Sequence, residues 1–158
     1  MKISFRFFYI LPFVMILGIP WLILGNSIFT IGQFTPIKLS AALLFVLGLT
    51  LLFLSQRRVY KPEQWTKQAM PFDEPNQLVT QGIYRHSRNP MMCGLYLMLL
   101  GEALFFRSWP LFYFLIFIIV VSTLVITLVE EPRLEKRFGD VYRKYKKEVP
   151  RFIPKLFY

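Results

Sequence analysis

Two clusters of charged residues flank the last two long apolar stretches of the sequence. Arg85 and Arg88 precede a stretch that opens with Pro90, and Glu130 and Glu131 directly follow the next stretch. A helix beginning at Pro90 offers backbone N–H groups and a positive dipole end, so the arginine cluster suits a carboxylate or phosphate. Two adjacent carboxylates are costly without donors, so the glutamate cluster suits an ammonium group or ribose hydroxyls.

The two clusters meet only if the intervening chain forms a helical hairpin. The stretches 90–106 and 109–129 are separated by Arg107 and Ser108 alone, and Trp109 follows as an interfacial anchor. Such a hairpin returns to the face from which it left, which brings both clusters together. S-adenosylmethionine, with a carboxylate, an ammonium, a ribose and a sulfonium, would match this divided site. The charges are equally compatible with arginines that hold lipid phosphates and glutamates in a surface salt-bridge network.

The composition indicates that these elements lie in a membrane. Hydrophobic residues make up 55% of the 158 residues, well above the share in soluble domains. They gather in four blocks, each long enough to cross about 30 Å of hydrocarbon. The blocks are 5–24, 37–55, 90–106 and 109–129. We therefore expect an all-α integral membrane protein of one domain with about four transmembrane helices, the first block being a span and not a signal peptide.

The basic residues predict the orientation. All of the 19 lysines and arginines except Lys38 and Arg107 lie before or at the start of the first block, between the second and third, or after the fourth. Positive residues mark the cytosolic side, so both termini should be cytosolic, and a bacterial inner membrane is the expected location. This topology, with membrane lipids as partners, accounts for the net charge of +10 without nucleic-acid binding.

Three single residues carry narrower expectations. Cys93 and His86 are each the only residue of their type, so we expect no disulfide and no metal site. Glu102 lies on the third block near its outer end, where we expect it to snorkel or to pair with Arg107, five positions later.

The segment after the fourth block should form a separate helix. Because proline disfavours helical geometry in its predecessor, we expect the fourth span to break and a new helix to start at Pro132. Apolar residues then recur at three- and four-residue steps: Leu134, Phe138, Val141, Tyr142, Tyr145 and Val149. Cations occupy most other positions, so the pattern predicts an amphipathic helix at the membrane interface.

Two motifs in this order resemble the isoprenylcysteine carboxyl methyltransferase and phospholipid methyltransferase family of membrane enzymes. Residues 71–94 read PFDEPNQLVTQGIYRHSRNPMMCG, similar to the family's proline-containing lead-in, Gly-x-Tyr-Arg turn and Arg-(His or Asn)-Pro signature. Residues 130–154 read EEPRLEKRFGDVYRKYKKEVPRFIP, similar to its paired glutamates, Phe-Gly, spaced tyrosines and closing Val-Pro-Arg. The hairpin between the motifs has a matching length.

The resemblance implies an S-adenosylmethionine-dependent methyltransferase that releases S-adenosylhomocysteine. The acceptor would be lipophilic or small, with the carboxylate of an isoprenylcysteine favoured. By resemblance the cofactor-binding residues are Tyr84, Arg88, Asn89, Pro90, Met92, Gly94, Glu130, Glu131, Tyr142, Tyr145 and Arg151, and the catalytic residues are Arg85 and Glu131. Residues 1–158 would form one domain: two spans in 1–55, a cytosolic loop in 56–89, the hairpin in 90–129 and a cofactor-covering segment in 130–158.

The sequence also departs from the family pattern. Asn89 replaces a histidine and Met92 replaces a tyrosine found in many members, so imidazole or aromatic contacts with the cofactor there would be lost. His86 is displaced and is not the equivalent of the family histidine. Gly94 and Gly101 are expected to serve helix packing first, although Gly94 also belongs to the signature.

Several alternatives stay open at this level. A sterol-type membrane reductase that uses NADPH resembles the same C-terminal region, and a non-catalytic membrane partner could keep the same fold. A carboxylate or thiolate acceptor needs no base, whereas a protonated amine would need one, with Glu130 or Glu131 nearest. The sequence chooses neither among oxygen, nitrogen and sulfur acceptors nor the oligomeric state.

Overall fold

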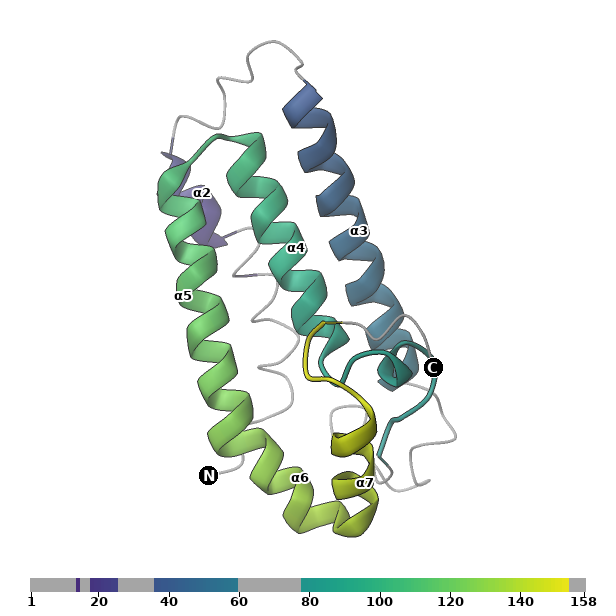
Figure 1. Cartoon of the computed structure of the whole chain (residues 1–158). Helices are drawn as coiled ribbons and strands as arrows, with labels where there is room; N and C mark the ends of the chain where they lie inside the picture. Colours follow the sequence, from purple (N-terminus) through teal and green to yellow (C-terminus); the bar gives the residue numbers. More distant parts are fainter. Residues whose placement is uncertain (1–13, 15–17, 26–35, 60–77, 154–158) are drawn as a thin grey trace.

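The computed structural model describes residues 14, 18–25, 36–59 and 78–153, and every regular element in these ranges is helical. The elements are α2 (Ile19–Leu24), α3 (Pro36–Val59), η4 (Gly82–Arg85), α4 (Pro90–Phe105), α5 (Trp109–Val125), the π-helical η5 (Ile126–Glu130), α6 (Glu131–Phe138) and α7 (Asp140–Glu148), as Figure 1 shows. The all-α prediction is confirmed for these residues.

Two helices are long and apolar enough to cross a membrane, Pro36–Arg57 and Trp109–Phe138. The helix Pro90–Phe105 is apolar but shorter. Most of the expected first span lies outside the described residues. Its end is described and forms α2. The membrane character is therefore supported, whereas the number of four spans stays a prediction.

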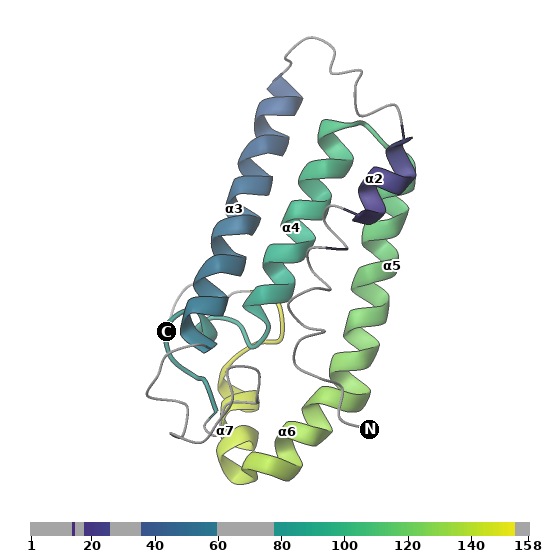
Figure 2. The same ribbon diagram turned by 180° about the vertical axis from the view of Figure 1, so that it is seen from behind.

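Helices α3 and α4 run side by side and approach each other backbone to backbone (Figures 1 and 2). A Cβ atom added to Gly94 would lie 2.7 Å from the carbonyl oxygen of Gly48, and one added to Gly101 would lie 2.7 Å from that of Ala41. Such distances are too short for a side chain, so glycine is needed at both positions. The packing role expected for Gly94 and Gly101 is confirmed.

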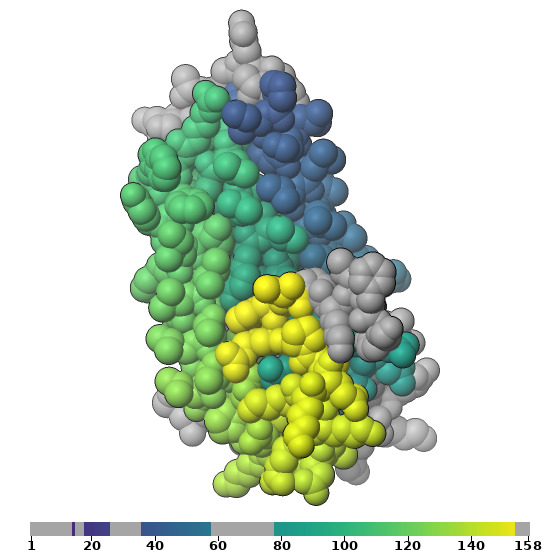
Figure 3. All heavy atoms as spheres, in the orientation of Figure 1, coloured from purple at the N-terminus to yellow at the C-terminus, as the bar shows by residue number. Residues whose placement is uncertain are grey.

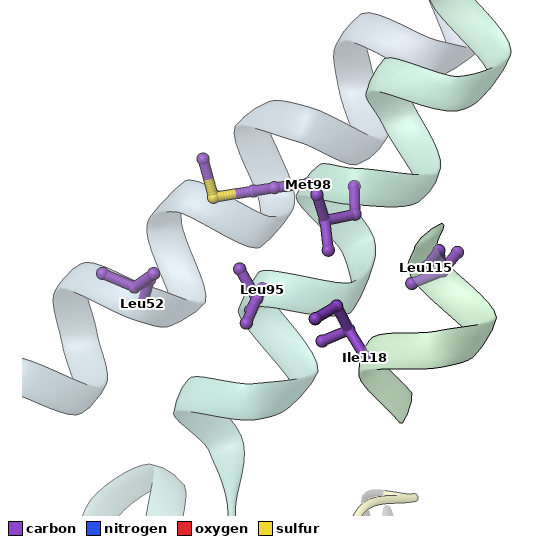
Figure 4. Packing of buried hydrophobic residues seen from close by; sticks show 6 residues of the cluster. Leu52, Leu95, Met98, Leu115 and Ile118 are labelled. Atoms are coloured by element: carbon purple, nitrogen blue, oxygen red, sulfur yellow. The ribbon is translucent and has the colours of Figure 1, made fainter. Parts of the chain in front are cut away.

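A buried apolar cluster joins α3, α4 and α5. Its members are Leu52, Leu95, Met98, Leu99, Leu115 and Ile118, five of which are labelled in Figure 4. Helices α4 and α5 form the predicted hairpin, since only Phe106, Arg107 and Ser108 separate them. The Ser108 hydroxyl accepts a hydrogen bond from the Leu111 N–H (3.5 Å) and so caps α5.

Glu102 differs from the expectation. Its side chain is buried between the helices, and its Oε2 atom has no hydrogen-bond partner among the described residues. Arg107 instead lies exposed in the hairpin turn with a positive φ of 51°. The expected pairing of these residues is therefore wrong, because the turn directs Arg107 away from α4.

The predicted helix break before Pro132 is also wrong. The chain stays helical from Trp109 to Phe138, because the π turn η5 connects α5 to α6. Within this turn the Glu131 N–H bonds to the Ile126 carbonyl, five residues back. Pro132 directly follows this turn as the second residue of α6.

The actual break lies at Gly139, whose φ is 57°. A residue with a side chain rarely adopts this value, so glycine permits the chain to turn between α6 and α7. The single amphipathic helix that the pattern predicted is therefore two short helices. Figure 1 shows α7 folded back toward the start of α4.

The apolar residues of this region pack on the protein itself. Tyr142, Tyr145 and Val149 are buried, and Leu78, Leu134 and Phe138 pack against them. Val141, which shares the predicted apolar pattern, is exposed. The three- and four-residue spacing thus identified most of the buried face, which packs on the protein itself. The location of this segment at the membrane interface stays a prediction.

Candidate active site

The two charged clusters meet at the end of the hairpin opposite its turn. Arg88, just before α4, places Nη1 2.8 Å from Oε1 of Glu131, the first residue of α6. Both side chains are nearly buried, with exposed fractions of 9% and 4%. A buried ion pair is stable only when further hydrogen bonds satisfy its atoms. The predicted juxtaposition is confirmed for Arg88 and Glu131.

Glu131 also forms ion pairs with two more cations. Arg151 Nε lies 2.8 Å from Oε1, and Lys146 Nζ lies 3.1 Å from Oε2. Lys146 also pairs with Glu135 at 2.9 Å, and its hydrogen bonds with Glu135 and then Glu131 raise the pKa of the lysine. We call Arg88, Glu131, Glu135, Lys146 and Arg151 the Glu131 cluster. Three cations face two carboxylates in it, so one positive charge is left over.

The backbone of the C-terminal segment 149–153 crosses the start of α4. The Val149 carbonyl accepts a hydrogen bond from Arg88 Nε (2.9 Å), and the Pro150 carbonyl accepts one from Arg88 N (2.9 Å). The Arg151 carbonyl accepts from Asn89 N and Ser87 Oγ (3.1 Å each) and from Asn89 Nδ2 (3.3 Å). The Phe152 carbonyl accepts from Cys93 Sγ (3.1 Å). Four successive carbonyls are thus used, and Figure 3 shows the yellow C-terminal residues lying over the teal lower end of α4.

These bonds occupy donors that come just before the predicted anion site. The N–H groups of Arg88 and Asn89, which precede the first residue of α4, bind the C-terminal segment. The segment leaves α7 in extended geometry at Val149, so its carbonyls can point toward the turn.

Three tyrosines lie beside the acidic pair. The Tyr145 hydroxyl donates to the Tyr84 carbonyl (2.6 Å), and the rings of Tyr142 and Tyr145 have centroids 6.3 Å apart. Burial raises the pKa of Tyr84, with further contributions from Tyr145 and the negative charge of Glu130. Burial also raises the pKa of Tyr142, although its hydrogen bond from Arg88 Nη1 (3.4 Å) acts in the opposite direction.

The other predicted site residues lie elsewhere. Pro90 is buried as the first residue of α4, and Met92 packs against the apolar cluster between the helices. Gly94 faces Gly48, as described above. Arg85 ends η4 with an exposed side chain, and the contacts of Glu131 go to Arg88, Arg151 and Lys146 instead.

Sequence reasoning missed two residues of the site. Lys146 holds two carboxylates, and Ser87 is buried and anchors the C-terminal segment. Lys146 follows Tyr142 by one helical turn, so the helix period would have placed it on the inner face of α7. Among the described residues, no group of three or more histidine, cysteine, aspartate or glutamate side chains could hold a metal ion.

Comparison with known proteins places these features in a family. Residues 37–141 match the phospholipid methyltransferase family, and this range includes both Arg88 and Glu131. The chain belongs to the phospholipid methyltransferase family. That membership favours methyl transfer over the reductase alternative.

A curated protein to which the chain is similar is the protein-S-isoprenylcysteine O-methyltransferase of Schizosaccharomyces pombe. The two sequences are 35% identical over 88 residues, which cover 49% of this chain and 33% of the relative. The match thus spans a third of the length of the yeast protein. No solved structure matches the chain.

Proposed function

We propose that this protein is an S-adenosylmethionine-dependent methyltransferase that acts at the cytosolic membrane face on a lipophilic or small acceptor. The observation that carries the proposal is the buried contact of Arg88 with Glu131, 2.8 Å long. It joins two motifs that are 43 positions apart. Few charged groups are buried at such a cost unless they are satisfied by partners or used for binding.

The side chains of the cluster fit the charged groups of this cofactor. Arg88, Arg151 and Lys146 could hold its carboxylate, for which the excess positive charge leaves room. Glu131 and Glu130 could accept hydrogen bonds from its ammonium and ribose hydroxyls. When bound, it supplies a methyl group activated by a sulfonium.

The protein's own part in the reaction is binding, alignment and exclusion of water. An in-line methyl transfer requires the acceptor atom, the methyl carbon and the sulfur to lie on one line. The buried residues Tyr142 and Tyr145 and the C-terminal segment would shield this line from water. Arg88 and Glu131 would orient the reactants electrostatically.

For the acceptor we favour the carboxylate of an isoprenylcysteine. The yeast relative carries this specificity in its name. A carboxylate is already nucleophilic, so no base is required. The lipid portion would reach the site from the bilayer between the exposed apolar faces of the helices, while the cofactor would enter from the cytosol.

The test is transfer of label by the purified protein. The protein is incubated with methyl-labelled S-adenosylmethionine and, separately, N-acetyl-S-farnesylcysteine, phosphatidylethanolamine vesicles and a small thiol. We expect base-labile label on the farnesylcysteine and protection of the protein against proteolysis by S-adenosylhomocysteine. Protection by NADPH alone, without transfer to any acceptor, would show that the proposal is wrong.

A further inference from the structure

The helix Trp109–Phe138 departs from α geometry at η5, directly before the Glu131 cluster. Residues Ile126–Glu130 form a π turn, in which the Glu131 N–H reaches the Ile126 carbonyl five residues earlier. A π turn amounts to one extra residue inserted into an α-helix, and it is often found at functional sites. Its position here determines which way the following residues face.

The buried positions show the effect of the extra residue. On α5 and η5 the buried side chains fall at steps of three and four: Leu111, Leu115, Ile118, Ser122 and Ile126. The next buried side chain is Glu131, after a step of five. Each residue of an unbroken α-helix advances by about 100° around the axis. A residue five positions after Ile126 would therefore point about 140° away from the buried face. A step of four from Ile126 would then bring Glu130 to the buried face.

Pro132 gives a physical reason for the π turn. A proline in α geometry loses one hydrogen bond, and its ring collides with the carbonyl four residues back. For Pro132 that carbonyl belongs to Leu128, which lies inside the π turn. The wider turn removes the collision without ending the helix. Pro132 itself is exposed, so its ring is not required for packing in the core.

We propose that Pro132 is a positioning residue, which stabilises the π turn and thereby points Glu131, and not Glu130, at Arg88, Arg151 and Lys146. Glu130 is left on the side of Tyr84, whose pKa its charge helps to raise. The two glutamates therefore serve different groups, although they are adjacent in sequence. The importance of this arrangement for catalysis rests on the proposed function, whereas the arrangement itself does not.

The first test uses binding of S-adenosylhomocysteine to the purified full-length protein. In Pro132→Ala the turn can become α-helical, so Glu131 rotates away and affinity falls about tenfold or more. The helical content measured by circular dichroism should not fall, because alanine is a better helix former than proline. Pro110→Ala is the matched control, since Pro110 is also exposed in the first turn of a helix and lies near the hairpin turn.

A rescue variant separates positioning from general damage. Deleting Val129, whose side chain is exposed, shortens the step from Ile126 to the second glutamate to four residues. Combined with Pro132→Ala, this deletion returns that glutamate to the buried face of a regular helix. We expect affinity to recover to within about threefold of the parent, a difference of about 0.7 kcal/mol. Parent-like binding by Pro132→Ala would overturn the inference.

Thiol labelling gives a readout that does not depend on the proposed function. In a Cys93→Ser background, maleimide should react slowly with Glu131→Cys and faster with Glu130→Cys, and adding Pro132→Ala should reverse this order. An unchanged order contradicts the positioning role. A reversed order in a protein whose parent binds no S-adenosylhomocysteine supports the positioning role and contradicts the proposed function.

Discussion

The interface between α3 and α4 and the Glu131 cluster hold the molecule together in opposite ways. At the interface, glycines allow two backbones to touch, and a cluster of apolar side chains is buried beside them. In the cluster, Arg88, Glu131, Lys146 and Arg151 meet from four positions along the chain, and each contact joins particular charged atoms.

This difference indicates that helix packing and ligand binding depend on different regions of this fold. Packing of small residues depends on volume alone and leaves no charged group that could bind a ligand. The cluster depends on individual donors and acceptors, so it loses its function when a charge is removed without any change of volume. Substitutions in the two regions should therefore affect stability and binding to different degrees.

The largest effect should come from Glu131→Gln. This change leaves three cations without their shared carboxylate, so affinity for S-adenosylhomocysteine should fall about a hundredfold. Equilibrium titration measures the loss. Glu130→Gln is the comparison and should cost less, because it removes one proposed contact with the cofactor but leaves the three cations paired with Glu131. Equal losses in both variants would remove the distinction between the two glutamates.

The second prediction concerns the interface. Gly94→Ala and Gly101→Ala each bring a Cβ to 2.7 Å from a backbone carbonyl, so each should lower the free energy of unfolding by about 1–3 kcal/mol. Denaturant titration in detergent measures this. If Gly94 serves packing alone, the folded fraction of both variants keeps parental affinity for S-adenosylhomocysteine. A loss of affinity restricted to Gly94→Ala would restore a direct role in cofactor binding.

The third effect depends on pH and on Lys146. Hydrogen bonds to Glu135 and Glu131 raise the pKa of Lys146 in the folded protein above that in the unfolded chain. Its contribution is therefore complete below about pH 10.4, the ordinary value for lysine, and is lost as pH rises through the raised pKa. Thermal midpoints should fall more steeply above that pH in the parent than in Lys146→Met. Parallel curves would contradict this coupling.

The smallest effect should come from Tyr96→Phe. The Tyr96 hydroxyl lies 2.5 Å from that of Ser122 and joins α4 to α5. Hydrogen bonds between membrane helices contribute about 0.6 kcal/mol on average, so the loss in unfolding free energy should be of that order. Tyr113→Phe, at an exposed position on α5, serves as the control and should change nothing measurable.

The sequence was sufficient to predict the hairpin and the meeting of Arg88 with Glu131. Two apolar stretches joined by two residues leave little freedom, because antiparallel neighbours must return to the same face. The packing role of Gly94 and Gly101 was equally accessible, since small residues on apolar helices commonly mark close contacts. These features follow from local composition.

The remaining features depend on competition between structures of similar energy. Pro132 could end the helix or widen it, and in the structure the helix widens and Glu131 lies buried among three cations. Pairing of the turn at Arg88 with the carbonyls after Val149 joins segments about sixty positions apart, and backbone bonds carry no sequence signature. Lys146 was missed because its neighbours Lys144 and Lys147 have the same charge.

A double-mutant cycle on Arg88 and Glu131 tests the central claim most directly. Affinity for S-adenosylhomocysteine is measured by equilibrium titration in the parent, Arg88→Met, Glu131→Gln and the double variant. If the two residues form one binding unit, the double variant should bind no more weakly than the weaker single variant. Losses that simply add, or parental affinity in all three variants, would contradict the account.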